Sequence, residues 1–377
     1  MPLGIYVHIP FCLSKCPYCD FNSIVYDSSL AQEYVSSLLK EIRLFSKVQT
    51  QRIEADTIYF GGGTPSILKS SQLDSILEAL FSSFQIRESS EISLEANPGT
   101  LIEEGIKEIM GLGINRVSLG IQSLADEGLK ALGRVHTRDQ AIKSYQLLRG
   151  YFENISLDLI FGIPGQTLKS WKRSLTTVVK LKPEHLSVYC LTVEEGTPFY
   201  RLRKDKKLNL PDEEGTRKMY LGAIELLKSQ GYTHYELSNF ARVGRECRHN
   251  LKYWRGEEYI GFGAGAHSYL DGVRRGNIKK VNDYIKRCKE GVSIIDFKER
   301  LTLSQKINEF ILLGLRRIEG FDLKRLKEDL GFDLEKEKKK EIRYLIDKNF
   351  LKKEKNVLKL TRKGILVADS VMEKLIP

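Results

Sequence analysis

Six short apolar segments alternate with amphipathic segments over the first 290 residues, and this alternation constrains the fold more than any other feature. The expected strands are 4–9, 56–60, 91–95, 116–121, 154–161 and 185–190. The expected helices between them include 30–45, 71–84, 102–112, 138–149 and 168–180. Strand–helix alternation predicts a parallel sheet covered by helices. Six units suffice for an open or partial barrel, so we expect an α/β fold.

The chain changes character toward its C-terminus. A long helix is expected over 211–231, followed by an irregular stretch over 232–269 that is rich in glycine and aromatic residues. Beyond residue 296 the pattern predicts helices at 303–318, 323–329 and 334–348, two strands in LKKEKNVLKLTRKG and a last helix. Three helices with a hairpin resemble a winged helix. We therefore expect two domains, 1–290 and 291–377, the second of winged-helix-like α+β type.

The composition, 41% hydrophobic and 29% charged, is that of an ordinary folded protein. No apolar run reaches the ~18 residues of a membrane-spanning helix, and the N-terminal residues do not resemble a secretory signal. We expect a cytoplasmic protein whose six cysteines are metal ligands or buried thiols. The net charge is +11, and 291–377 holds 21 basic and 15 acidic residues. Such a surface attracts nucleic acid, anionic membrane or acidic small molecules, or consists of solvated lysines.

Polar residues stand at the ends of several expected strands. Glu95 closes SLE, Gln122 closes SLGIQ, Asp158 lies in ISLDLIF, and GGGTP (61–65) follows DTIYF. In barrel-like α/β folds, functional groups gather at the C-terminal ends of the strands. A single such residue could cap the next helix, but four in succession favour a shared site.

Three cysteines directly after the first strand, Cys12, Cys16 and Cys19, have the spacing C-x-x-x-C-x-x-C. This spacing suits a loop wrapped around a metal centre. Three thiolates do not complete a tetrahedral zinc site, but they suit a four-iron four-sulfur cluster with one open iron. Zinc with a distant fourth ligand and plain buried thiols remain the alternatives. Cys190, Cys247 and Cys288 are too scattered to form a motif.

The cysteine spacing followed by GGGTP resembles the radical S-adenosylmethionine (radical SAM) superfamily. YVHIPFC, Glu95, Gln122 with Arg134, Asp158 and IFGIPGQT are similar to the oxygen-independent coproporphyrinogen III oxidase group within it. This resemblance covers nearly the whole chain. It implies a partial (β/α)6 TIM-like barrel, a four-iron four-sulfur cluster and bound SAM.

The resemblance also implies a role for individual residues. Tyr6 would lie over SAM, Tyr18 would touch its adenine, and the backbone of Gly62, Gly63 and Thr64 would receive its methionine amino group. Glu95 would hold other polar groups of SAM. Three further residues match positions that contact a second SAM in the oxidase: Gln122, Arg134 and Asp158. A helix cap at Asp158 and a surface ion pair at Arg134 are the alternatives.

Other features depart from the oxidase. Phe21 stands where the oxidase has an additional cysteine, and the first strand begins at residue 4, which leaves no room for the oxidase's N-terminal extension. The sequence RHNLKYWRG contains H-N-x-x-Y-W, formed by His249, Asn250, Tyr253 and Trp254. This motif and CPYCDFNS resemble the heme chaperone branch of the group, the HemW family.

His249 is the candidate heme ligand, because a neutral imidazole is a common axial ligand of iron. Nearby arginines could pair with the heme propionates, and Tyr253 and Trp254 could pack on the porphyrin; the arginines are Arg242, Arg245 and Arg248. A Cys247 thiolate and a purely structural histidine are the alternatives. His267, in GFGAGAHSY, is expected to have a role in the SAM pocket.

The resemblance thus implies a heme chaperone that binds heme and delivers it to membrane-bound respiratory proteins. The alternative is a coproporphyrinogen oxidase that decarboxylates propionates. A third hypothesis, a radical SAM enzyme that binds nucleic acid, is not favoured, because the C-terminal segment 291–377 contains acidic as well as basic residues. Besides heme, the partners to consider are its membrane-bound acceptors and a second copy of the chain. We expect at most peripheral membrane contact and no binding of nucleic acid.

Overall fold

The computed structural model describes residues 1–47 and 51–377. Its centre is a sheet of twelve strands, in which six neighbouring strands run parallel. The six parallel strands are β1 (Leu3–Ile9), β4 (Glu54–Gly62), β5 (Gln85–Ala96), β6 (Arg116–Gln122), β7 (Ile155–Phe161) and β8 (His185–Cys190). The predicted partial barrel of six β/α units is therefore confirmed.

The sheet extends beyond these strands at both edges. β11 (Tyr259–Phe262) pairs parallel with β1, and antiparallel strands follow it. The antiparallel strands on this edge are β12 (His267–Leu270), β13 (Val273–Asn277) and β14 (Ile295–Arg300), and those beside β8 are β10 (Asn239–Ala241) and β9 (Thr233–Glu236). The interpretation of 232–269 as irregular was wrong. The expected domain boundary after residue 290 precedes β14, which still belongs to the large sheet.

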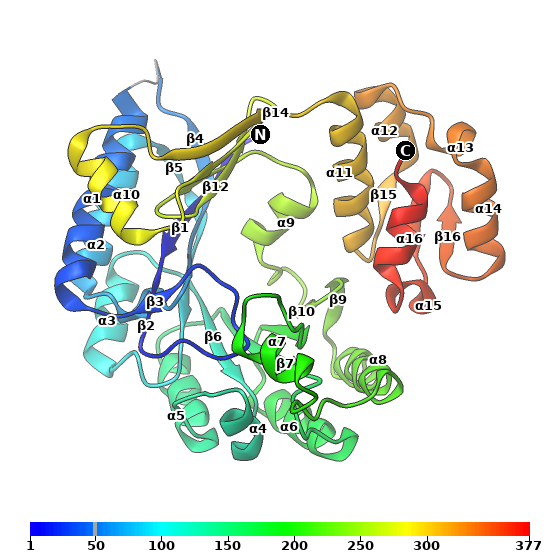
Figure 1. Ribbon diagram of the computed structural model, residues 1–377, viewed down its shortest axis with the longest axis horizontal. Coiled ribbons are helices and arrows are strands. Elements are labelled where there is room, and N and C mark those ends of the chain that lie inside the picture. Colours follow the sequence, from blue (N-terminus) through cyan, green and yellow to red (C-terminus); the bar gives the residue numbers. More distant parts are fainter. Residues whose placement is uncertain (48–50) are drawn as a thin grey trace.

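Helices cover the outer face of the sheet (Figure 1). They are α1 (Ser28–Lys47), α2 (Ser70–Ser83), α3 (Glu103–Gly111), α5 (Arg138–Arg149), α6 (Leu168–Leu181), α8 (Glu213–Ser229) and α10 (Val281–Glu290). The short helices α4 (Asp126–Ala131) and α7 (Pro198–Lys204) belong to a smaller hydrophobic cluster beside the strand ends. In α1, for example, Ala31, Tyr34, Leu38 and Ile42 recur at helical spacing and are buried. The parallel strands are apolar and almost continuously buried, as expected where the faces of a sheet are covered.

The C-terminal part forms a second hydrophobic core around a three-stranded sheet. Its elements are α11 (Leu303–Arg316), β15 (Phe321–Asp322), α12 (Leu323–Leu330), α13 (Leu334–Glu337), α14 (Lys339–Asp347), β16 (Leu351–Glu354), β17 (Val357–Leu360), α15 (Arg362–Ile365) and α16 (Ala368–Leu375). This agrees with the predicted winged-helix-like domain, although Lys338 divides the helix expected over 334–348. Two backbone bonds join this domain to the barrel, from Leu237 N to Arg316 O (3.0 Å) and from Ile318 N to Tyr235 O (3.1 Å).

The short helix α9 (Arg248–Trp254) carries the H-N-x-x-Y-W motif. It lies between the large sheet and the C-terminal domain (Figure 1). Its side chains contact Pro2 and Asp56, near the starts of β1 and β4. These contacts anchor α9 near the starts of the strands, whereas the cysteines and the GGGTP segment follow the strand ends. Asn250 of the motif nevertheless lines the same cavity as the cysteines. Separately, no helix among the described residues is long and apolar enough to cross a bilayer.

Candidate functional site

A cavity of about 490 Å³ opens at the C-terminal ends of the parallel strands. This volume is within the ~300–1,000 Å³ typical of sites for small ligands. All the predicted site residues except Tyr6 and His249 line it: Cys12, Cys16, Tyr18, Cys19, Gly62, Gly63, Thr64, Glu95, Gln122, Arg134 and Asp158. The structure thus brings together side chains that are far apart in the sequence, at the end of the barrel where functional groups gather.

The cysteine loop is fixed against the glycine-rich segment by backbone contacts. Gly63 N donates to Ile9 O (2.8 Å) and Thr64 N donates to Phe11 O (2.7 Å). A Cβ atom on Gly63 would lie 2.6 Å from the Phe11 carbonyl oxygen. The two segments can therefore approach this closely only because residue 63 has no side chain.

Two hydrogen-bond donors point at the cysteine sulfurs. Thr64 Oγ1 donates to Cys12 Sγ and Arg134 Nη1 donates to Cys16 Sγ, each at 3.5 Å. All three thiols of the loop are free and partly exposed to the cavity. Across 1–47 and 51–377, no three His, Cys, Asp or Glu side chains are arranged around a single metal ion. The sulfurs and their donors could instead hold an iron–sulfur cluster, whose thiolate ligands are stabilised by such hydrogen bonds.

Glu95 is the central carboxylate of the cavity. It accepts hydrogen bonds from Tyr59 Oη (2.8 Å) and Gly62 N (3.1 Å). Burial raises the pKa of Glu95 to about 7, and the nearby Asp158 carboxylate also raises it, whereas the hydrogen bonds from Tyr59 and Gly62 lower it. Burial also raises the pKa of Asp158, whose carboxylate accepts from Ser118 and Ser156. Asp158 is therefore bonded within the barrel and does not cap a helix.

Gln122 and Arg134 complete the wall near the cysteines. Gln122 has a φ of 58°, in the left-handed region that a residue with a side chain rarely adopts. Such strain is frequent at functional sites. Arg134 donates to the Gly120 carbonyl oxygen (3.1 Å) and to Asn97 Oδ1. In the part of the chain that the structure describes, Arg134 forms no surface ion pair.

Some residues of the cavity were missed by the sequence analysis. Asn97 donates to Thr64 Oγ1 (2.7 Å) and accepts from Arg134, so it bridges two predicted site residues. Its position directly after the strand SLEA was a usable signal. Arg116 also lines the cavity and is only 1% exposed, and its Nε and Nη1 have no partner among the residues that the structure describes. Nothing in the sequence distinguishes Arg116 from an ordinary residue at the start of a strand.

Tyr6 does not line the cavity. Its hydroxyl is bonded to His8 Nδ1 (3.0 Å), and its ring stacks against that of Tyr59 at a centroid distance of 6.3 Å. Because Tyr59 lines the cavity and Tyr6 packs beside it, Tyr6 supports the wall rather than forming its surface.

His249 is buried outside this cavity, and both of its ring nitrogens are hydrogen-bonded. Nδ1 contacts Thr57 Oγ1 and Nε2 contacts Tyr253 Oη, each at 2.8 Å. The imidazole also stacks on Tyr59, with the ring centroids 5.3 Å apart. Burial lowers the pKa of His249 to about 3, and the positive charges of Lys252 and Arg116 contribute. His249 is therefore neutral at physiological pH.

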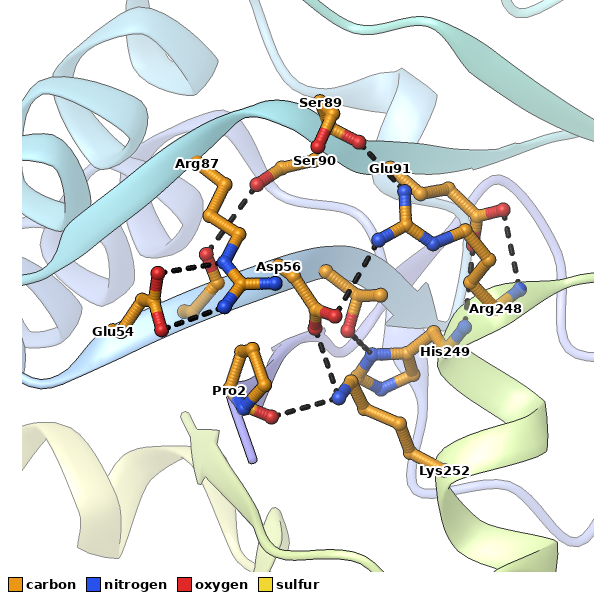
Figure 2. Close-up of polar contacts among 12 residues, drawn as sticks. Pro2, Glu54, Asp56, Arg87, Ser89, Ser90, Glu91, Arg248, His249 and Lys252 are labelled. Atoms are coloured by element: carbon orange, nitrogen blue, oxygen red, sulfur yellow. Dashed lines mark hydrogen bonds and ion pairs between the residues drawn. The ribbon is translucent and has the colours of Figure 1, made fainter.

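Figure 2 shows how α9 is held against the strands. Lys252 Nζ lies 2.9 Å from Asp56 and Arg248 lies 3.4 Å from the same carboxylate. Glu91 accepts hydrogen bonds from the backbone N–H groups of Arg248 (3.2 Å) and His249 (3.3 Å). These contacts fix the helix that presents His249.

The arginines considered for propionate binding do not line the cavity, and each contacts other groups of the protein. Arg242 donates to the Gln230 carbonyl oxygen and stacks on Tyr232, Arg245 is 4.0 Å from Glu153, and Arg248 is held by Asp56. Their expected pairing with propionates has no support in this arrangement.

Cys247, the alternative ligand, and His267, the residue expected in the SAM pocket, also lie outside the cavity. Cys247 is fully buried with Sγ 3.7 Å from Glu91, and burial raises its pKa to about 12, so it is a protonated thiol. His267 is exposed on β12, beside Phe297 at a ring-centroid distance of 5.4 Å. The expected role of His267 in the SAM pocket is not supported by this position.

Comparison with solved structures supports the fold. The coproporphyrinogen III oxidase HemN of Escherichia coli, described as a radical SAM enzyme, is similar with a TM-score of 0.86. The similarity covers 100% of this chain and 90% of that chain at 22% sequence identity. At this identity the similarity establishes the shared architecture.

Sequence comparison establishes the family. The radical SAM superfamily model matches residues 6–178, and the HemN C-terminal domain model matches residues 301–367. The heme chaperone HemW of Bacillus subtilis is 38% identical, with 97% of each chain covered. The HemW of Lactococcus lactis is 36% identical, with 99% of this chain and 97% of the relative covered. The chain therefore belongs to the HemW family of the radical SAM superfamily.

Proposed function

We propose that this protein is a heme chaperone that binds heme and delivers it to membrane-bound respiratory proteins. The observation that carries the proposal is the similarity to proteins named heme chaperone HemW over 97% of the chain. The intact H-N-x-x-Y-W motif on α9 supports it. Any contact with a membrane would be peripheral, through the basic side chains of the C-terminal domain.

The cavity at the C-terminal strand ends would hold the resident cofactors. Cys12, Cys16 and Cys19 would ligate a four-iron four-sulfur cluster, with Thr64 and Arg134 donating to two of the sulfurs. When bound, the cluster supplies an electron to SAM. In the same cavity, Glu95 would accept hydrogen bonds from SAM hydroxyl or ammonium groups, while Tyr18 would contact the adenine.

The remaining cavity residues would bind further polar groups. Gly62 and Gly63 would let SAM approach the backbone closely. A second SAM molecule, if bound, would contact Gln122, Arg134 and Asp158, all of which line the same cavity. Tyr6 would act indirectly, by packing beside Tyr59.

We assign His249 Nε2 as the axial ligand of the heme iron. If Tyr253 Oη donates to Nε2, then Nδ1–H donates to Thr57 Oγ1, and Nε2 carries the lone pair that a metal needs. A hydrogen bond from the other ring nitrogen orients most metal-binding histidines, and Thr57 provides it here. Because Tyr253 covers Nε2, heme binding would require this hydroxyl to move.

The second candidate function is coproporphyrinogen III oxidation, favoured by the fold shared with the oxidase and by the intact SAM cavity. Against it stands Phe21, where the oxidase group has an additional cysteine. Phe21 is 61% exposed at the mouth of the cavity. A phenyl ring there can neither ligate a metal nor donate a hydrogen atom as a thiol does.

Two assays on one anaerobically reconstituted preparation separate these functions. In the first, the heme-loaded protein is mixed with membranes that contain heme-free respiratory oxidase, and recovery of the oxidase spectrum is followed. In the second, the protein receives coproporphyrinogen III, SAM and a reductant, and products are separated by chromatography. We expect heme transfer and no protoporphyrinogen. Many turnovers to protoporphyrinogen without heme transfer would overturn the chaperone assignment.

A further inference from the structure

A second cavity, of about 640 Å³, lies between the barrel and the C-terminal domain. On the barrel side it is walled by Tyr253 and Trp254 of α9 and by Tyr259 of β11. On the other side, Phe310 and Leu313 of α11 face it. It shares no lining residue with the cavity of the cysteines. Its volume also suits a small-molecule ligand.

Aromatic side chains form a large part of the cavity walls. The Tyr253 and Tyr259 rings meet edge to face, with centroids 4.6 Å apart, and Phe310 meets Phe321 edge to face at 5.6 Å. Aromatic rings that are already fixed in this way offer a large apolar contact area at little further entropic cost. A planar conjugated molecule would bury its faces between the two domains.

Three arginine side chains gather at one part of this cavity. Burial lowers the pKa of Arg317, and the nearby guanidinium groups of Arg255 and Arg325 lower it further. The carboxylates of Glu319 and Asp329 are already paired with Arg317 (2.8 Å) and Arg325 (3.0 Å). Arg255 lies 3.9 Å from Glu257, so each of the three guanidinium groups has one carboxylate neighbour and the lining carries no excess of positive charge. An anionic ligand would therefore be recognised by the N–H donors that these pairs leave unused.

Within the described residues, two buried donors of the same cavity have no acceptor. They are the indole Nε1–H of Trp254 and the Nε–H of Arg317. An unsatisfied buried donor costs about 1–3 kcal/mol, so such groups are rare unless a ligand or water completes them. These two donors need an acceptor that enters from the cavity, and a carboxylate is a suitable one.

We propose that this cavity is the binding site of the transported tetrapyrrole, with its ring between α9 and α11 and its propionates on Arg317 and Trp254. This inference rests on the proposed function. It also explains the position of His249. Tyr253 both lines the cavity and bonds to His249 Nε2, so the imidazole lies directly behind the cavity wall. The motif residues His249, Tyr253 and Trp254 then serve one site.

The test compares ferric heme with its dimethyl ester, in which both propionates are uncharged. Each is titrated into the anaerobically reconstituted protein while the Soret band is followed. Loss of charged hydrogen bonds should weaken the ester about tenfold to a hundredfold relative to heme. Arg317→Gln should weaken heme by a similar factor but leave the ester unchanged. Arg362→Gln is the control, because Arg362 is an exposed arginine of the same domain that lines neither cavity.

SAM provides the second readout. Saturating heme should leave the affinity for SAM unchanged, because the two cavities are separate. Three outcomes would each overturn this location without contradicting heme binding itself. They are equal affinity of the wild type for heme and for its ester, an Arg317→Gln variant that still prefers heme over the ester as strongly as the wild type does, and displacement of SAM by heme. If the wild type does not bind heme saturably, the proposed function fails instead. The ester comparison on the wild type needs no variant to fold.

Discussion

Lys252 holds α9, and hence His249, against the barrel. Its ammonium group lies 2.9 Å from Asp56, 3.1 Å from Glu257 and 2.7 Å from the Pro2 carbonyl oxygen. The Lys252 side chain is only 6% exposed, and the two carboxylates are 14% and 12% exposed. The Lys252→Met substitution would keep the apolar stem and remove the charge between two nearly buried carboxylates.

Breaking a buried ion pair from one side costs about 3–5 kcal/mol. Arg248 remains 3.4 Å from Asp56 and Arg255 remains 3.9 Å from Glu257, so each carboxylate keeps one weaker partner. We therefore expect the low end of the range, about 3 kcal/mol. Because α9 is the element that loses its anchor, this free energy should appear as easier local opening of α9.

Hydrogen exchange followed by mass spectrometry measures that opening. At 3 kcal/mol, the protection of the α9 amides should fall roughly 150-fold in Lys252→Met. Lys289→Met is the matched control, because Lys289 pairs with Glu33 at the surface with both side chains about half exposed. Such a pair contributes at most about 1 kcal/mol, or about fivefold in protection. Protection of α9 in Lys252→Met within fivefold of the wild type would refute the anchoring role.

Two further predictions follow from burial and close contact. The folded-state pKa of His249 is lowered to about 3. Between pH 6.5 and 3 the unfolded chain therefore binds a proton at this residue that the folded chain does not bind. The free energy of unfolding consequently decreases as the pH falls through this window. Urea unfolding at pH 7 and at pH 5 measures this decrease. It should be about 2 kcal/mol smaller in His249→Gln than in the wild type. The same decrease in both proteins would contradict a buried neutral imidazole. Gly63→Ala should lower the amounts of iron and sulfide bound after reconstitution, because the new Cβ would lie 2.6 Å from the Phe11 carbonyl oxygen. Gly105→Ala is the control and should retain both, because its Cβ would meet no atom within 4 Å. Full cluster content in Gly63→Ala would show that this close approach is dispensable.

The sequence predicted the barrel because each β/α unit carries its own local signals. An apolar strand such as ISLDLIF and a helix with regularly spaced apolar residues such as α1 can be recognised from neighbouring residues alone. Polar residues at strand ends, such as Glu95 and Gln122, were predictable for the same reason, since all parallel strands end at one edge.

The rest depends on contacts between distant segments. The edge strand β11 pairs with β1 across more than 250 residues, and no local pattern indicates its parallel direction. The sequence placed His249 among ligand-binding residues, but only the structure places it beside Thr57 and Tyr253, outside the cavity that the three cysteines line. The second cavity lies between two domains, so neither domain's pattern predicts it.

The central claim is that this chain carries heme on His249. It is tested most directly by titrating ferric heme into the anaerobically reconstituted wild type and His249→Ala, following the Soret band and the iron–sulfur content. His234→Ala is the control, because His234 is a buried histidine of the same domain that lines neither cavity. We predict saturation near one heme per wild-type chain and at least tenfold weaker binding in His249→Ala, with the cluster retained and the control unchanged. Equal heme affinity in the wild type and His249→Ala, or no saturable binding in the wild type, would contradict the claim.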